Sequence, residues 1–233
     1  NAYVLAALKT YNVMANLNEF KKFDIIVLNH GIYVPQGAIV DFAKKNKIKS
    51  ISWCASSKKN SFIFSKHDTY HKSLLSEPNK KWENIVLTNK KIKKIKHYLK
   101  SRAMGSKDWI YFHNKQPNFD IKKFFKTYRI DKNKPIVTLL TNVVWDAQLH
   151  FKKNIFKNMN EWVFHAINYF KKNKDKQLII RAHPAEITGG VPSKEKIGNL
   201  INKKFQKLSD NIKFIGPENK LSTYPLCYKS DSI

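Results

Sequence analysis

The residues best suited to phosphate chemistry follow an apolar segment in the C-terminal half. Arg181, His183, Pro184 and Glu186 come directly after residues 177–180. Arginine and histidine donate hydrogen bonds to phosphate oxygens, and proline constrains the chain so that the imidazole projects beyond the segment. In open α/β sheets, ligands bind beyond the carboxyl ends of the strands. This pattern predicts an anion site. The alternative is that His183 only ends a strand and pairs with Glu186.

Two hydroxyl residues form a second candidate group. Ser222 and Thr223 follow the sequence Gly-Pro-Glu at 216–218 and are expected at the start of a helix. Hydroxyl groups and main-chain amides at a helix start bind anions, although Ser222 is equally suited to ordinary helix capping. Asp146 lies in the loop after residues 135–141. It is suited to orient a sugar hydroxyl or act as a base, with capping of the next helix as its alternative role.

The N-terminal half carries groups suited to binding and deprotonating a hydroxyl. A general base must be a histidine or carboxylate within reach of the proton, and our candidates are His30 and Asp68. Residues 62–71 combine aromatic rings with hydroxyl, carboxylate and imidazole groups, which are typical of sugar sites. The residues expected to bind an acceptor are Gln36, Lys58, His67, Tyr70 and His71.

Metal and nucleotide-cofactor motifs are missing from the sequence. His67 and His71 have i, i+4 spacing, but neither a carboxylate at a recognised spacing nor a cysteine accompanies them. We therefore predict no metal and no cofactor. The chain has no P-loop, no strand-linked GxGxxG and no GxSxG elbow. These absences argue against P-loop NTPases, dinucleotide oxidoreductases and α/β-hydrolases.

Strand-like and helix-like segments alternate, which predicts an α/β fold with parallel sheets. A polar, proline-terminated boundary at Asp131–Pro135 divides the chain into domains 1–133 and 134–233. Both domains are expected to be incomplete, because the sequence begins at Asn1 rather than Met and residues 231–233 begin a strand. The expected strands are 24–29, 48–53, 83–88, 135–141, 177–182 and 212–215. The expected helices are 38–47, 88–101, 154–173, 193–208 (capped by Ser193) and 221–228, and 54–76 is expected to be a long functional loop.

The charge balance allows a polyanion partner. The formal net charge is +27, but the basic residues comprise 41 Lys and three Arg. Readers of bases and phosphates favour the bidentate arginine fork, so a nucleic-acid-binding module is the weaker interpretation. A solvated lysine surface explains the excess equally well. Attraction to an anionic membrane, on the order of 1 kcal/mol for each lysine near the surface, is a third interpretation.

Features of targeting and oxidation point to the cytoplasm. Cys54 and Cys227 lie far apart, which disfavours a disulfide scaffold. The longest apolar runs are far shorter than the roughly 20 residues that span a bilayer. No signal peptide opens the sequence. We therefore expect a cytoplasmic protein, in peripheral contact with the inner face of the membrane.

Several segments together resemble a known family. NHGIYVPQGAIVDFAKK, SFIFSKHDTYHKSLL, PIVTLLTNVVWDAQLHF, LIIRAHPAE and IKFIGPENKLSTYPLCYKSDSI look like the capsule polysaccharide biosynthesis proteins of bacteria. These are GT-B-like glycosyltransferases related to capsular Kdo transferases. The His183-Pro184 pair resembles a motif shared with bacterial sialyltransferases and teichoic-acid polymerases.

The resemblance implies two Rossmann-like domains and metal-independent transfer of a sugar from a CMP-linked donor to a capsular or surface polysaccharide. It implies that His183, Ser222 and Thr223 contact the donor phosphate. Expected partners are the nucleotide sugar, a glycan or lipid-linked glycan acceptor, and the capsule export machinery. The alternatives are a CDP-polyol phosphotransferase of the teichoic-acid type, a basic nucleic-acid-binding module, and a non-catalytic capsule assembly subunit.

Overall fold

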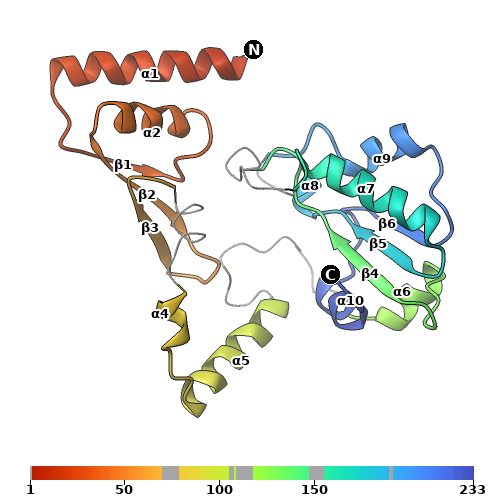
Figure 1. The fold of residues 1–233 in the computed structure, drawn as a ribbon. Helices are drawn as coiled ribbons and strands as arrows, with labels where there is room; N and C mark the ends of the chain where they lie inside the picture. Colours follow the sequence, from red (N-terminus) through yellow and green to blue (C-terminus); the bar gives the residue numbers. More distant parts are fainter. Residues whose placement is uncertain (1, 70–78, 105–107, 109–117, 147–154, 189–190) are drawn as a thin grey trace. The chain divides into compact units, whose positions relative to one another are not determined.

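The fold was obtained as a computed structural model, which describes residues 2–69, 79–104, 108, 118–146, 155–188 and 191–233. The chain forms two compact units, the first mainly Asn1–Arg102 and the second mainly Tyr111–Ile233 (Figure 1). Each unit is an α/β structure with a small sheet that contains parallel strands. This class of structure is compatible with Rossmann-like folds.

The second unit is built on a parallel sheet of β4 (Ile136–Leu140), β5 (Gln177–Arg181) and β6 (Ile212–Ile215), in the order β4-β5-β6. All five residues of β5 are buried. A central parallel strand is covered on both faces, which explains its continuous apolar sequence. These three strands confirm the predicted segments to within a residue at each end.

Helices cover both faces of this sheet (Figure 1). One face carries α7 (Met159–Lys172) and α9 (Ile197–Phe205), whose buried side chains pack against alternate residues of β5. The other face carries α6 (Ile121–Thr127) and α10 (Thr223–Lys229). The short α8 (Ala185–Thr188) follows β5 directly. The unit is thus a three-layer α/β/α structure, the arrangement in which parallel sheets bury both faces.

The residues after α10 return to the outer edge of β4. Ser232 forms a parallel bridge with Val137, and the Ser232 carbonyl accepts a hydrogen bond of 2.9 Å from the Thr138 amide. The Asp231 amide donates to the Ile136 carbonyl, and the Ile136 amide donates to the Asp231 carboxylate. The three strands thus stand in the order third, second, first in the chain, and the bridge at Ser232 lies beyond the first strand. This order is compatible with a Rossmann-like sheet.

The first unit has a mixed sheet. β1 (Ile25–Asn29) and β2 (Lys49–Ala55) are parallel and are connected through α2 (Gln36–Lys45), whereas β3 (Phe62–Lys66) is antiparallel to β2. Two predictions are corrected here. The sheet is not all parallel, and the segment 54–76 is not one long loop. The strand in FIFSK was missed because both of its faces carry large apolar side chains, which hides the alternation of a strand.

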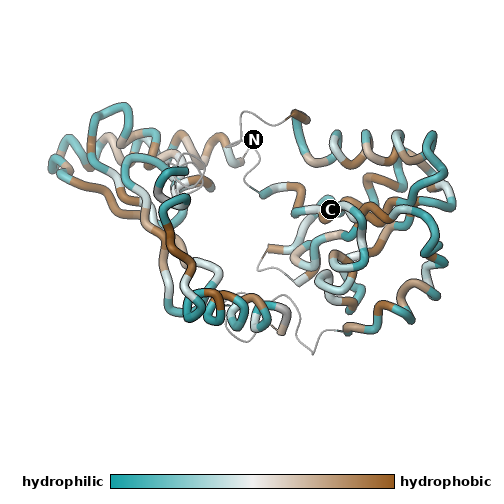
Figure 2. The backbone as a smooth tube through the Cα atoms, turned by 60° about the horizontal axis from the view of Figure 1, so that its bottom comes forward, coloured by the Kyte–Doolittle hydropathy of each residue, from teal (hydrophilic) through white to brown (hydrophobic). Residues whose placement is uncertain are grey.

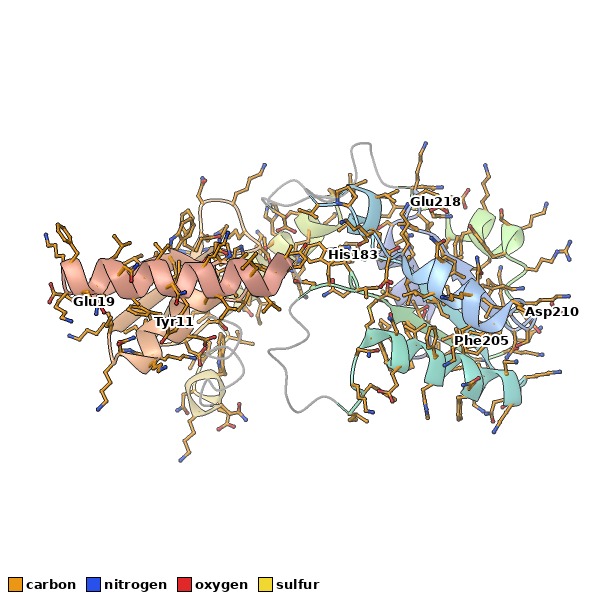
Figure 3. The ribbon with its side chains drawn as sticks, turned by 90° about the horizontal axis from the view of Figure 1, so that it is seen from above. Tyr11, Glu19, His183, Phe205, Asp210 and Glu218 are labelled. Carbon is orange, nitrogen blue, oxygen red and sulfur yellow. The ribbon has the colours of Figure 1, made fainter. Side chains whose placement is uncertain are left out.

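A long helix, α1 (Ala2–Phe20), was not predicted from the sequence. It contacts α2 through Tyr11, whose ring lies edge-to-face with Phe42 at 5.5 Å between centroids (Figure 3). Many of its apolar side chains are exposed, so its hydrophobic residues lack a single buried stripe. This even distribution around the helix removes the periodicity that reveals an amphipathic helix.

The remainder of the first unit comprises α4 (Lys80–Glu83) and α5 (Asn89–Ala103). The predicted strand at 83–88 is wrong, because α4 ends at Glu83 and the next five residues form no strand. Asp108 anchors α5 by accepting hydrogen bonds from the Tyr98 hydroxyl (2.8 Å) and the Arg102 Nε (3.1 Å).

The predicted domain boundary at 133/134 cuts through the second unit. Phe124, Phe125 and Ile130 are buried against residues of the sheet, including Ile136 and Ile179. The segment from α6 to β4 therefore belongs to the core that it precedes. Of the helices in the described ranges, none combines the length and the hydropathy needed to cross a membrane.

Candidate anion site at the carboxyl edge of the second sheet

The end of β5 is tied to the end of β4. The His183 amide donates to the Thr141 Oγ1 at 3.2 Å, and the Thr141 amide donates to the Arg181 carbonyl at 3.0 Å. Figure 3 shows His183 at the opposite end of the unit from Asp210, which precedes β6. His183 thus lies at the carboxyl edge of the sheet, where ligands of open α/β folds bind.

The imidazole of His183 is half-buried and caps the short helix α8. Its Nδ1 accepts a hydrogen bond of 3.0 Å from the Ala185 amide. A neutral ring that accepts at Nδ1 must carry its proton at Nε2. The structure therefore defines the tautomer and makes Nε2 a donor. His183 does not pair with the Glu186 carboxylate, which was the alternative. The Glu186 carboxylate instead accepts a hydrogen bond from the Ile197 amide.

Arg181 has a different role from the predicted one. Its side chain is 2 % exposed, and its guanidinium donates to the carbonyls of Gly216 and Asn219, the latter at 2.7 Å. Burial lowers the pKa of Arg181, and the carboxylate of Glu218 opposes that effect. Because its two terminal nitrogens bind main-chain carbonyls, Arg181 holds the β6–α10 loop in place. This geometry does not support direct contact between Arg181 and a donor phosphate.

Glu186 also points into the protein. Its residue is fully buried, and its Oε1 accepts a hydrogen bond of 2.9 Å from the Ile197 amide at the start of α9. Within the described residues its Oε2 has no hydrogen-bond partner. Burial raises the pKa of Glu186, although the Ile197 bond and the charge of Lys196 oppose the change. Glu186 therefore positions α9, and we no longer assign it to donor contact.

The loop after β6 brings a further carboxylate to the site. A Cβ added to Gly216 would clash with the carboxylate of Glu218, so the Glu218 side chain folds back over this glycine. The electrostatic influence of Glu218 reaches both Arg181 and Glu186. A carboxylate accepts hydrogen bonds from sugar hydroxyls but repels phosphate. Glu218 is therefore suited to the ribose or sugar part of a ligand.

Ser222 and Thr223 begin α10, as expected, but Ser222 does not face solvent. It is buried, and its Oγ accepts a hydrogen bond of 3.4 Å from the Tyr224 amide. The Ser222 amide donates to the Asn118 carbonyl at 2.8 Å. Ser222 is thus a helix cap, the alternative considered from the sequence. Thr223, the first residue of the helix, is half-buried.

Asp146 lies in the turn after β4. The Asn142 Nδ2 donates to its Oδ2 at 3.0 Å. Asp146 does not cap α7, because that cap is Asn158. The neighbouring Trp145 is exposed and its Nε1 donates to Ser193 at 3.2 Å. Ser193 was predicted to cap α9, but that helix begins at Ile197, so this prediction is wrong.

In the first unit, the segment after β1 lies against the segment after β3. Gly31 has a φ of +78°, and a Cβ built on it would lie 3.0 Å from Val40 and 3.8 Å from Thr69. Only glycine fits such a positive φ and close approach without strain. His30 has a φ of +56°, and its amide donates a hydrogen bond to the Trp53 carbonyl. Its ring packs edge-to-face on Tyr33. The fold thus brings the His30 and Asp68 segments close together.

Asp68 is paired rather than isolated. Its Oδ2 lies 3.2 Å from the Lys44 Nζ, its Oδ1 accepts from the Thr69 amide at 2.7 Å, and its carbonyl accepts from Ser52. The Lys44 ammonium and the Thr69 amide thus contact both carboxylate oxygens of Asp68. We therefore prefer His30 of the two candidate bases.

Of the residues expected to bind an acceptor, the structure describes Gln36, Lys58 and His67. His67 is exposed with a φ of +63°, Gln36 is the half-buried first residue of α2, and Lys58 is exposed in the β2–β3 turn. Tyr70 and His71 lie outside the described residues. Across the described ranges, no group of three or more His, Cys, Asp or Glu residues is arranged to hold a metal ion.

Sequence reasoning did not assign a role to Thr141, Asn219 or Lys44. The signal for Thr141 was present, because a hydroxyl residue ends a predicted strand beside His183. Asn219 and Lys44 act through contacts with residues distant in sequence, which no local pattern reveals. Comparisons with known protein families, with curated proteins and with solved structures gave no match.

Proposed function

We propose that this chain is part of a GT-B-type glycosyltransferase that transfers a sugar from a nucleotide donor, CMP-linked, to a capsular or surface polysaccharide. The observation that carries the proposal is His183 at the carboxyl edge of a Rossmann-like sheet. Its Nδ1 accepts from the Ala185 amide, so its Nε2 is the donor. The segments that resemble capsule biosynthesis proteins motivate the same assignment.

The proposed chemistry is a displacement at the anomeric carbon. The bond between that carbon and the phosphate oxygen breaks, and a new bond forms to the acceptor hydroxyl. The acceptor proton passes to a base, for which His30 is our first candidate and Asp68 the second. The nucleoside monophosphate leaves with the bonding electrons. Hydrogen bonding from the His183 Nε2 stabilises the developing negative charge without a metal.

Other residues support this site indirectly. Arg181 holds the loop that carries Glu218, Glu186 holds the start of α9, and Ser222 caps α10. We assign Pro184 to directing His183, since α8 begins immediately after it. Asp146 remains a proposed contact for a sugar hydroxyl. The acceptor contacts, Gln36, Lys58, His67, Tyr70 and His71, remain proposals.

Calorimetric titration with CMP, UMP and GMP tests the donor site. We expect CMP to bind most tightly and His183→Ala to weaken its binding about tenfold, the loss of one charge-assisted hydrogen bond. His183→Gln, whose amide can donate from a similar position, should retain part of the affinity. His97→Ala removes an exposed histidine of α5 and serves as the matched control.

Equal CMP binding by the parent protein and His183→Ala would refute the proposed phosphate contact. Product analysis with the full-length enzyme then separates the two transfer reactions. Release of a nucleoside monophosphate with a glycosidic product supports the glycosyltransferase. A phosphodiester in the polymer would instead identify the polyol-phosphate transferase, which uses the same phosphate contacts.

A further inference from the structure

Large apolar side chains are exposed along the segment Lys80–Ala103, which contains α4 and α5. Trp82 is 61 % exposed, Val86 73 %, Leu87 57 % and Leu99 56 %. Such a concentration on one segment differs from the scattered exposed apolar residues of an ordinary surface, and it marks an interaction site. This segment lies outside the candidate anion site, so the transferase chemistry does not account for it.

The same segment is strongly basic. α5 contains six Lys and one Arg and no acidic residue. Ile92, Ile95 and Leu99 recur at spacings of three and four, which places them in one stripe along the helix. Lys93, Lys96 and Lys100 form an exposed row at the same kind of spacing. Figure 2 shows the resulting mixture of hydrophobic and hydrophilic positions along α5.

The hydrogen bonds described for this helix involve the side chains of neither the stripe nor the row. Tyr98 and Arg102 both donate to Asp108, and Ser101 is buried. At the other end, the Lys91 Nζ donates to the Val86 carbonyl at 3.0 Å and ties the start of α5 to the preceding apolar residues. Leu99 and the exposed lysines are therefore presented on a helix that these hydrogen bonds fix at both ends.

We propose that the segment Lys80–Ala103 docks the protein on an anionic lipid bilayer. The segment combines the lysine-rich helix α5, which also exposes Leu99, with the exposed Trp82 of α4. Amphipathic helices of this composition lie in the plane of a membrane interface. Lysine heads reach lipid phosphates while apolar side chains enter the acyl boundary. Nucleic acid accounts for the lysines, and for Trp82 through base stacking, but not for the exposed aliphatic Val86 and Leu99. This inference does not depend on the proposed transferase activity.

Vesicle co-sedimentation tests the proposal with the whole protein. The parent should bind phosphatidylglycerol vesicles and bind phosphatidylcholine vesicles weakly. The triple variant Lys93→Glu, Lys96→Glu and Lys100→Glu should bind phosphatidylglycerol at least about 100-fold more weakly, because each lysine contributes about fivefold. The matched control is Lys122→Glu, Lys123→Glu and Lys126→Glu on α6, which changes the net charge equally with exposed residues of the second unit.

A second pair of variants tests the apolar contribution. Trp82→Ala with Leu99→Ala should weaken vesicle binding most clearly at high salt, where lysine attraction is screened. Circular dichroism should show that both sets of variants retain the fold, since the substituted side chains are exposed. Equal vesicle binding by the α5 and α6 variants would overturn the proposal. A nucleic-acid gel shift lost only in the α5 variant, without vesicle binding by the parent, would overturn it in favour of nucleic acid.

Discussion

Three charged or imidazole side chains at the carboxyl edge of the second sheet have three different roles. His183 accepts a hydrogen bond at Nδ1, which leaves Nε2 as its donor. Arg181 donates to two main-chain carbonyls, and Glu186 accepts from the amide at the start of α9. Side chains that are close in sequence thus differ in what they bind. Alternation along the strand and the turn at Pro184 separate the groups that hold the site from the one that we propose contacts the ligand.

At the scale of one residue, Glu186→Gln should change how stability depends on pH. Burial raises the pKa of Glu186 above its ordinary value of 4.5, so the folded state binds the proton more tightly than the unfolded chain. Stability from this group is greatest below that ordinary value and declines as pH rises through the raised value. Glutamine does not titrate. The variant should therefore gain stability relative to the parent between pH 4 and pH 7.

Urea unfolding at several pH values measures this difference. Glu195→Gln is the matched control, because Glu195 is an exposed carboxylate only nine positions away. Its stability relative to the parent should be nearly constant over the same range. Parallel pH profiles for the parent and Glu186→Gln would show that the buried carboxyl does not titrate as proposed.

At the scale of an element, the β6–α10 loop depends on Arg181. The guanidinium supplies hydrogen bonds to the Gly216 and Asn219 carbonyls, and the Asn219 side chain in turn donates to the Tyr128 hydroxyl at 2.9 Å. Arg181→Ala removes both guanidinium hydrogen bonds together with a buried side chain, although the Gly216 carbonyl still accepts from the Asn219 amide at 3.2 Å. The variant should lower the free energy of unfolding by about 2–4 kcal/mol. Arg181→Lys should cost less, because it keeps the charge but lacks the planar fork.

Hydrogen exchange of the amides at 216–221 locates the effect. It should accelerate in Arg181→Ala more than exchange in α7, which packs on the opposite face. Arg129→Ala, a change at an exposed arginine of the same unit, should alter stability by less than about 0.5 kcal/mol. A similar loss from both variants would mean that the loop does not depend on the buried guanidinium.

At the scale of the whole molecule, the two units have separate hydrophobic cores. The core of the second unit includes Phe124, Phe125 and Ile130, which precede the sheet in sequence. A fragment of residues 118–233 should therefore fold and unfold cooperatively. A fragment of residues 134–233 should not, because truncating one buried phenylalanine already costs about 3–5 kcal/mol and typical domains have only 5–15 kcal/mol of stability.

Circular dichroism melts and proton NMR dispersion distinguish the two fragments. The control is the full chain, which should show the transition of fragment 118–233 at a similar temperature. Cooperative unfolding of fragment 134–233 would contradict the assignment of α6 to this core. Loss of the transition in both fragments would mean that the second unit needs the first for its stability.

The apolar strands and the amphipathic helix of the second unit could be predicted from the sequence alone. All five residues of β5 are buried, and β4 and β6 each have a buried residue on both faces. Burial on both faces favours the mainly apolar sequences of these strands. The apolar residues of α7 recur at helical spacing because only one face of that helix is buried. The expected position of His183 at a strand end is confirmed for the same reason, since the end of β5 is marked by the end of the apolar run.

Only the tertiary structure decided which side chains are proposed to contact a ligand at the carboxyl edge of the second sheet and which stabilise the loops around that edge. Arg181 bonds to carbonyls 35 and 38 residues away, and Asp68 pairs with Lys44 on another element. Likewise, β3 depends on pairing with β2, and α6 depends on the sheet that follows it. Local sequence determined where hydrophobic burial forms elements. The partner that each polar side chain binds depended on residues distant in sequence. A buried charge or hydrogen-bonding group is stable only where the fold places a matching charge, donor or acceptor beside it.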